Sequence, residues 1–400
     1  MLNQLLKASL SAMTPPIAII GAGPCGLTLA RLLECQKIDY VVYERDETAA
    51  SANAGGSLDI HQDTGQAALR KAGLWDEFRN QARWEDDRFT VYDKYGKQHL
   101  EHKGGDGDEA GRPEIDRKAL RQILLDSIPK EKIQWAKPLK AVRLDHANSP
   151  ILEFANGTTA SGFQLVVGTE GAWSKVRSMI TQAKPAYSGR TYIESQIPLE
   201  NPLYRAIADR IGYGTAAFLA GPTQMMVQRQ GNGWYRVYFG IRVPELYVGN
   251  TIDLTDVEAT RNALLSGFYA DWDEELKELL RCAGNFRSWP LFQLPADSQN
   301  WTTVPGLTLA GDAAHLALPN GEGVNCAMKD ALELASKIEA IGLQDLDDAV
   351  REYEKELLVR GRSHIEDGIQ LEQLLASDEG PTAVVKAFEQ MTKASHTGEM

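Results

Sequence analysis

Residues 17–26 constrain the fold more than any other part of the sequence. They read IAIIGAGPCG, a short apolar run followed by a GxGxxG motif. An uninterrupted apolar run of this length is typical of a buried parallel strand. Residues 27–33 then place leucines and an alanine at helical spacing, and a second apolar run covers 40–43. The order strand, glycine turn, helix, strand predicts a βαβ unit of an α/β protein.

The residues of this motif have separate roles in a dinucleotide-binding turn. Gly21 permits the tight turn, Gly23 lets the backbone approach a pyrophosphate, and Gly26 lets the helix pack closely on the strand. The helix that begins near Pro24 directs its free amides and positive dipole end toward that pyrophosphate. Glu44 ends the second strand, 18 residues after Gly26, where a carboxylate accepts hydrogen bonds from ribose hydroxyls.

A second glycine motif does not fit this role. Residues 212–217 read GYGTAA, but no predicted strand precedes them and Gly221-Pro222 would interrupt the helix. The sequence therefore predicts one dinucleotide fold, and a second nucleotide must bind without a Rossmann unit of its own.

A second segment, in the C-terminal third of the chain, is also expected to contact the dinucleotide. A predicted strand at 307–310 is followed by Gly311 and Asp312, and a glycine-rich turn opens the next helix. An aspartate at the end of a parallel strand can accept bonds from ribityl hydroxyls, and the turn's free amides suit negative charge on a reduced isoalloxazine ring. The turn consists of Pro319, Asn320, Gly321, Glu322, Gly323, Val324 and Asn325. Alone it is a common loop, but combined with the first motif it predicts a flavin site.

Three further segments fit a flavin. Residues 55–61 (GGSLDIH) bring small residues and Asp59 near the ring. Arg117 and Arg121 lie one helical turn apart, so they share a face. They either reach the pyrophosphate or ribityl oxygens of the cofactor or remain solvated. Residues 166–171 form a predicted strand that ends in Glu170 and a glycine.

From about residue 16 to about residue 353 the sequence resembles the group A, single-component FAD monooxygenases of the para-hydroxybenzoate hydroxylase type. Among them it is most similar to the flavin monooxygenases that inactivate tetracyclines. The matching segments are GGSLDIHQDTGQAALRKAGL, RPEIDRKALRQILL, SKVR, DWDEELKELL and GDAAHLALPNGEGVN. The resemblance implies that Glu44 and Arg45 hold the adenosine end of FAD, that Asp59 and Arg117 contact FAD, and that Asp312 and the 319–325 turn surround the flavin.

The resemblance also implies an architecture, a Rossmann-like α/β FAD-binding domain with an inserted β-sheet substrate domain and C-terminal helices. The length of 400 residues agrees, because single cores rarely exceed ~250–300 residues. We assign 14–80, 110–185 and 288–345 to the FAD-binding domain, 81–109 and 186–287 to the substrate domain, and 346–393 to C-terminal helices. We expect helices at 64–82, 114–128, 255–282 and 323–338, strands at 191–197, 216–220, 225–228 and 234–243, and a loose loop at 102–111.

The substrate half departs from the family pattern. Glu194 stands where the family offers a substrate-binding Gln, and Tyr238 where it offers a His. Glu322 replaces the Gln usual in the turn, and near Ala52 an arginine associated with NADPH is missing. Residues 214–218 contain no arginine where a substrate-contacting one is expected.

The predicted strand at 234–243 suggests which side chains of the substrate domain could contact a substrate. Period-2 alternation puts Tyr235 and alternate apolar residues in the core, and Trp234, Arg236 and Tyr238 on the opposite face. That face either lines a pocket for a planar polyphenol, with Arg236 balancing enolate charge, or is a solvated sheet face. We expect His61 and His315 to orient a loop or cap a helix rather than to act as catalytic bases.

The resemblance implies the reaction as well. NADPH reduces FAD, dioxygen adds at C4a of the flavin, and one oxygen passes to an electron-rich carbon, so no catalytic side chain is expected. Flexible Gly321 and Gly323 would suit movement of the flavin. The expected substrate is a polycyclic phenol or enol, with tetracycline-type antibiotics first. The alternatives are the same chemistry on another phenolic or polyketide metabolite, or a flavin-binding protein without oxygenase activity.

Composition limits the other partners. Acidic residues outnumber basic ones by 55 to 42, a net charge of −13 that disfavours nucleic acid and anionic membranes. The four cysteines form no CxxC pair, so we expect no metal, no dithiol centre and no disulfide framework. No uncharged apolar run approaches the ~20 residues of a membrane helix, and residues 1–13 make a poor export signal. We expect a cytoplasmic monomer.

Overall fold

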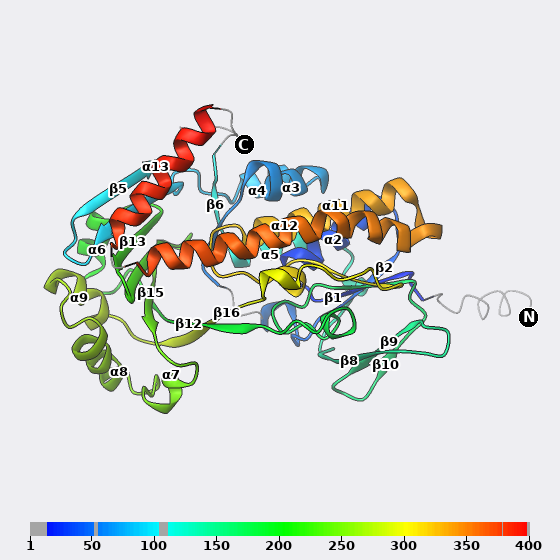
Figure 1. Cartoon of the computed structure of the whole chain (residues 1–400), viewed down its shortest axis with the longest axis horizontal. Coiled ribbons are helices and arrows are strands. Elements are labelled where there is room, and N and C mark those ends of the chain that lie inside the picture. The colour runs from blue at the N-terminus through cyan, green and yellow to red at the C-terminus, as the bar shows by residue number, and fades with distance from the viewer. Residues whose placement is uncertain (1–13, 52–54, 104–110, 378, 398–400) are drawn as a thin grey trace, which may run out of the picture.

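A computed structural model describes residues 14–51, 55–103, 111–377 and 379–397. Ala52 and most of the predicted 102–111 loop lie outside these residues, and His102 belongs to a strand. The described chain contains two large sheets, each beside its own hydrophobic core, and a long helix that runs across both (Figure 1).

The first sheet has five parallel strands in the order β17-β11-β1-β2-β7. Their bounds are β1 Ile17–Ile20, β2 Tyr40–Tyr43, β7 Ile133–Gln134, β11 Leu165–Gly168 and β17 Leu307–Leu309. The apolar runs predicted to be buried strands are confirmed, since β1, β11 and β17 are buried throughout. Helices α2 (Pro24–Cys35) and α11 (Gly323–Ile341) pack against each other over this sheet.

The second sheet has seven strands in the order β16-β12-β15-β14-β13-β4-β5. Their bounds are β4 Arg88–Asp93, β5 Gln98–Lys103, β12 Ala186–Ile197, β13 Thr215–Ala220, β14 Thr223–Arg229, β15 Tyr235–Arg242 and β16 Arg287–Gln293. One face carries Tyr235, Val237, Phe239 and Ile241 into a core formed with α8 (Val257–Ala263) and α9 (Glu274–Arg281). The alternation predicted for this strand is therefore confirmed.

Several predicted helices are shorter or broken. Residues 64–82 divide into a π-helical turn (Gln62–Gln66), α3 (Ala67–Lys71) and α4 (Trp75–Arg79). Gly73 adopts a positive φ of 69° and separates α3 from α4. The predicted helix at 255–282 is likewise interrupted between α8 and α9 by a π-turn, Leu264–Phe268.

The predicted helix at 114–128 is wrong at its start. Residues 114–116 form strand β6 (Glu114–Asp116), which pairs antiparallel with β3 (Ser57–Asp59), and α5 begins only at Arg117 (Arg117–Asp126). Pairing with a strand distant in sequence overrides the helical pattern here. The glycines at 212–214 precede strand β13 and no helix, in agreement with the rejection of that motif.

The remaining elements complete the two halves. A small sheet contains β8 (Leu139–Leu144), β9 (Pro150–Phe154) and β10 (Thr159–Ala160), and short helices are α6 (Tyr204–Ile211), α7 (Tyr247–Asn250) and α10 (Asp312–His315). The boundary we placed at residue 288 falls inside β16, whose pairing with β12 extends the larger sheet.

Helix α12 (Leu346–Leu375) runs along the molecule from α11 toward the larger sheet, where α13 (Pro381–Thr397) packs against β4, β5 and β13 (Figure 1). Helix α13 extends past the boundary expected at 393. None of the helices in the described residues is both long and apolar enough to cross a bilayer.

Candidate active site

A cleft of about 1190 Å³ opens at the carboxyl edge of the parallel sheet. Parallel strands end at one edge, so residues from distant parts of the chain meet there. The sequence-predicted residues that line it are Gly21, Gly23, Pro24, Glu44, Arg45, Arg117, Arg121, Asp312, Gly323 and Val324.

The three motif glycines have distinct surroundings. Gly21 has a φ of 109°, and its amide donates to the Tyr43 carbonyl at 2.8 Å, which fixes the turn to β2. A Cβ at Gly26 would overlap the Gly21 carbonyl oxygen, whereas a Cβ at Gly23 would meet no atom within 4 Å. Gly26 therefore serves helix–strand packing, and Gly23 faces the open cleft. No side chain caps α2, so its first amides remain available to an anion.

Glu44 is fixed beside this turn. One carboxylate oxygen accepts the Ala22 amide at 2.5 Å and the other accepts the Asp46 amide at 2.9 Å. A carboxylate oxygen has two acceptor sites, so each can still accept a hydroxyl. The side chain is buried, which holds it at the rim of the cleft.

Arg117 and Arg121 have different environments although they lie on one face of α5. Arg121 donates to the carbonyls of Ala22 (2.9 Å) and Ala49 (3.1 Å) and pairs with Asp46 at 3.3 Å, so it braces the glycine turn. The side chain of Arg117 lies against Gly55 and is close enough to Asp312 to favour the ionised carboxylate. Arg117 is therefore the better placed of the two to meet an anionic ligand.

Asp312 begins α10 at the end of β17. Its side chain is accessible from the cleft, yet the surrounding protein removes much of its hydration, and this desolvation raises the pKa of the carboxyl. The charges of His315, Arg117 and Arg177 act in the opposite direction. The preceding Gly311 amide is held by Asp330 at 2.7 Å.

His315 lies behind this residue. Its Nε2 is 2.6 Å from Asp330, which also pairs with Arg360 at 2.7 Å. The ring is fully buried and does not line the cleft. This environment agrees with the interpretation of His315 as a residue that orients its loop.

The 319–325 turn and the 55–61 segment lie beside each other, although they are far apart in sequence. Asn325 joins them, since its Oδ1 accepts the His61 amide at 2.8 Å and its Nδ2 donates to the Asp59 carbonyl at 2.9 Å. The predicted residues that do not line the cleft itself are Gly26, Asp59, Pro319, Asn320, Gly321, Glu322 and Asn325. Asn325 directly follows Gly323 and Val324, which do line the cleft, and its Nδ2 also lies 3.4 Å from the Gly321 carbonyl oxygen.

The substrate-sheet face contains a buried ion pair. Arg236 pairs with Glu194, whose second oxygen accepts the Trp289 indole N–H at 2.7 Å. Glu194 therefore neutralises Arg236, and the expectation that this arginine is free to balance an enolate is not met. Trp234 lies outside β15. Burial raises the pKa of Tyr238 to about 12, and its hydroxyl would lie 2.8 Å from a Cβ placed on Gly56.

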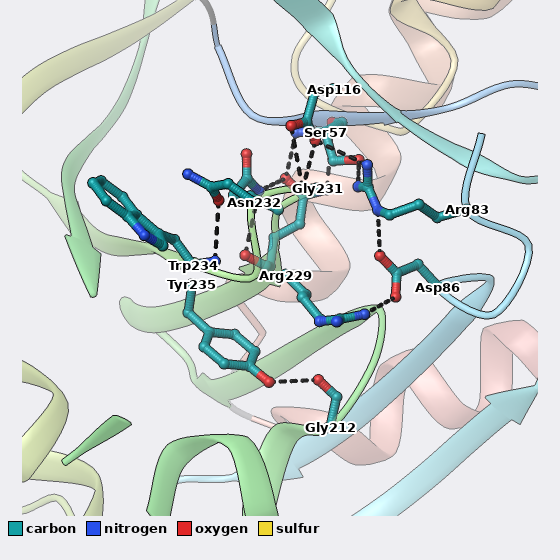
Figure 2. A network of polar contacts seen from close by, with 12 residues as sticks. Ser57, Arg83, Asp86, Asp116, Gly212, Arg229, Gly231, Asn232, Trp234 and Tyr235 are labelled. Carbon is teal, nitrogen blue, oxygen red and sulfur yellow. Dashed lines mark hydrogen bonds and ion pairs between the residues drawn. The ribbon is translucent and has the colours of Figure 1, made fainter. Parts of the chain in front are cut away.

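A polar network that the sequence reasoning missed ties this sheet to the 55–61 segment (Figure 2). Arg83 contacts Asp86 (2.6 Å), Asp116 (3.0 Å) and Ser57 (2.7 Å). Asp86 also pairs with Arg229 at 3.1 Å, and Asp116 accepts the Gly231 amide at 2.9 Å. The only signal in the sequence is the Arg83–Asp86 spacing, because the other partners are remote.

These residues suit FAD. The open space at Gly23 leaves room for the pyrophosphate of FAD. The Glu44 carboxylate can accept hydrogen bonds from ribose hydroxyls, and Arg117 and Asp312 can bind the charged and hydroxylated middle of FAD. The cleft extends from Glu44 to Gly323, so a ligand with a nucleotide at one end and a ring system at the other can contact both.

Comparison with known proteins agrees with this geometry. The family described as "FAD binding domain" matches residues 14–202 and 299–366. Monooxygenase penA of Penicillium thymicola is 32% identical over 85% of this chain and 90% of its own. Monooxygenase asqM of Emericella nidulans is 31% identical over 82% and 84%.

Solved structures share the fold. Klebsiella pneumoniae HpxO complexed with FAD and uric acid has a TM-score of 0.75 at 20% identity, covering 94% of this chain and 92% of that one. Tetracycline destructase Tet(55) has a TM-score of 0.72 at 18% identity, covering 96% and 97%. The glycine turn, the cleft and the sequence relatives lead to one conclusion: the chain belongs to the FAD-binding-domain family and is an FAD-dependent monooxygenase.

Proposed function

We propose that this protein is an NADPH-dependent hydroxylase that inserts one oxygen atom into a planar, electron-rich phenol or enol, with tetracycline-type antibiotics as the first candidates. The observation that carries the proposal is the position of Trp289. Its side chain lines the FAD cleft and also donates to Glu194 on the substrate-sheet face. A molecule on that face therefore borders the cofactor.

The overall reaction balances simply. A substrate C–H becomes C–OH, the second oxygen atom of O₂ leaves as water, and NADPH becomes NADP⁺ with uptake of one proton. Bound FAD would supply hydride acceptance and oxygen activation. Residues of the chain hold the reactants: the glycine turn, Glu44 and Arg117 are proposed to hold FAD, and Pro319 to Asn325 to support its ring end.

On the substrate side, three features are proposed to select the ligand. The Glu194–Arg236 pair carries no net charge, so this face favours a neutral substrate over a carboxylate. Tyr238 stays protonated at physiological pH and can donate one hydrogen bond. The partly exposed Trp289 ring provides a flat apolar surface for stacking.

A second candidate is another phenolic or polyketide metabolite. The support for it is that the fungal monooxygenases penA and asqM are 32% and 31% identical, whereas the tetracycline destructase Tet(55) is 18% identical and shares the fold. The departures at Glu194 and Tyr238 also fall on the substrate side.

The test uses the FAD-loaded protein and a panel of tetracyclines, neutral phenols, polyketides and aromatic carboxylates. We expect a neutral polycyclic compound to accelerate NADPH oxidation and to yield a product heavier by one oxygen atom. The variants Tyr238→Phe and Trp289→Ala should raise KM about tenfold, while Tyr95→Phe, at an exposed site, should not. Stimulation by carboxylates alone would contradict the proposal.

We also propose that the protein works on small molecules as a cytoplasmic monomer, without nucleic acid or membrane partners. The net charge of −13 supports the last point. Light scattering of the purified chain tests the oligomeric state.

A further inference from the structure

Asp59, His61 and Glu322 form a cluster of charged side chains beside the cleft. His61 Nε2 lies 2.7 Å from Asp59 Oδ2, and His61 Nδ1 lies 3.0 Å from Glu322 Oε1. Asp59 ends β3, and Glu322 directly precedes α11. The His61 side chain is only 12% exposed, whereas the Asp59 and Glu322 side chains are 33% and 38% exposed, so the ring is shielded and each carboxylate is partly hydrated. The cluster joins two segments more than 250 residues apart in the sequence.

The geometry defines the protonation of the ring. Ionised carboxylates only accept hydrogen bonds, so a ring nitrogen facing one must carry a proton. A neutral imidazole has a single N–H and would direct a lone pair at one of the two carboxylates. Both contacts form together only when His61 is an imidazolium.

We propose that His61 is a positioning residue whose imidazolium fastens the 319–325 turn to β3, and that Glu322 makes this fastening depend on the proton. The inference rests on the proposed function, because the turn supports the ring end of FAD through Gly323 and Val324, which line the cleft. His61 itself does not line that cleft, so it acts through the turn.

Asn325 shows why the proton matters at this position. It joins the same two segments through neutral hydrogen bonds that form at any pH. The 55–61 and 319–325 segments therefore stay together when His61 loses its proton. The turn before Gly323, however, then loses the ion pair between Glu322 and His61. A glutamine at position 322 would remove the requirement, since its amide can donate to an unprotonated ring nitrogen.

The direction of the pH dependence follows from the surrounding groups. Desolvation opposes the charged ring, but hydrogen bonds and charges from Asp59 and Glu322 outweigh it and raise the pKa of His61 to about 9. Farther out, Glu114 of β6 interacts electrostatically with Asp59, and His364 and Asp367 of α12 interact electrostatically with Glu322. The fastening is therefore complete at neutral pH and is lost as the pH rises through about 9.

The test follows the ring nitrogens of ¹⁵N-histidine by NMR in the FAD-loaded protein, with His61→Gln to assign the signal. We expect both nitrogens of His61 to be protonated at neutral pH and to titrate near 9. Glu322→Gln should lower that midpoint by about one unit or more. Glu366→Gln, which removes an exposed carboxylate of the neighbouring α12, is the matched control and should titrate as the unaltered protein does.

A second measurement uses FAD fluorescence to follow cofactor binding across the same pH range. Binding by the unaltered protein should weaken about tenfold above the His61 midpoint, and Glu322→Gln should remove that step. If Glu322→Gln does not fold, Asp59→Asn gives the same comparison from the other carboxylate.

The outcomes separate this inference from the proposed function. A neutral His61 at neutral pH, or a midpoint unchanged in both carboxylate variants, overturns the inference even where the protein hydroxylates a substrate. A midpoint near 9 that responds to Glu322→Gln supports it even where no substrate in the panel is hydroxylated.

Discussion

Gly23 and Gly26 belong to one motif, yet the space around each is different. A side chain at Gly26 would overlap the backbone of Gly21, while a side chain at Gly23 would point into the open cleft. Gly23 also has an ordinary φ of −83°, so a larger residue fits its backbone. The fold therefore requires a glycine at position 26. At position 23 the fold leaves room for a side chain, and only a ligand bound in the cleft would require a glycine there.

This difference gives the first prediction. Gly23→Val should leave the free energy of unfolding of the apoprotein within about 0.5 kcal/mol of its original value, yet weaken FAD binding more than about tenfold. Gly26→Ala should instead destabilise the fold by about 1–3 kcal/mol, because a backbone overlap cannot relax freely. Urea denaturation measures the first quantity and fluorescence titration with FAD the second.

The control is Gly267→Val. Gly267 also has no atom within 4 Å of a built Cβ, but it lies in the π-turn after α8 and not in the cleft. It should bind FAD normally. Normal FAD binding by Gly23→Val would show that the pyrophosphate does not approach the backbone there.

The positions of single residues in the cleft could be predicted where the residues belong to one motif and lie close together in the sequence. Gly21, Gly23 and Glu44 lie within one βαβ unit, so spacing alone brings them together. The neutralisation of Arg236 by Glu194 was not predictable, because it depends on the register between β12 and β15. The same applies to the contact between His61 and Glu322.

At the scale of elements, the β3–β6 ladder and the β14–β15 hairpin are joined by Arg83. Asp86 is 1% exposed and forms ion pairs with both Arg83 and Arg229 (Figure 2). Asp116 accepts a hydrogen bond from the Gly231 amide in the hairpin. Ser57 opens β3, and Asp116 directly precedes Arg117. The network therefore sets how the substrate sheet sits against the segment that carries Asp59.

We predict that Arg83→Met destabilises the protein by about 2–3 kcal/mol, since it removes charged hydrogen bonds to Asp86, Asp116 and Ser57. Amide hydrogen exchange should accelerate first in the hairpin around Gly231 and in β3, ahead of the parallel sheet. Arg79→Met, at an exposed position of α4, should change neither stability nor exchange. Uniform acceleration over both sheets would contradict a local linking role.

Whole elements differed in how well the sequence predicted them. Strands β1, β2, β11 and β17 are short apolar runs, and burial on both sides leaves them few alternatives. Residues 114–116 lie next to a strong helical pattern, and only pairing with β3 makes them a strand. The polar strands β4 and β5 were not located individually, because β5 is half exposed and shows no clear alternation.

At the scale of the whole molecule, α12 connects the two halves. Its 30 residues extend about 45 Å. Near its start, Leu346, Val350 and Tyr353 pack in the core of the parallel sheet, and near its end Leu374 packs beside the larger sheet. There Glu372 accepts the Arg190 guanidinium of β12 at 2.7 Å, and Arg190 is fully buried.

This pair carries the last prediction. Arg190→Met leaves the Glu372 carboxylate buried without its cation, which should cost about 3–5 kcal/mol and release the end of α12 together with α13. The double variant Arg190→Met/Glu372→Met should recover much of that loss, because it removes both charges. Lys355→Met breaks an exposed pair with Glu352 on the same helix and should cost less than about 1 kcal/mol. Urea denaturation gives the free energies, and limited proteolysis near residue 380 reports release of α13. Equal losses in the single and double variants would mean that the packing of Arg190, and not its charge, joins the two halves.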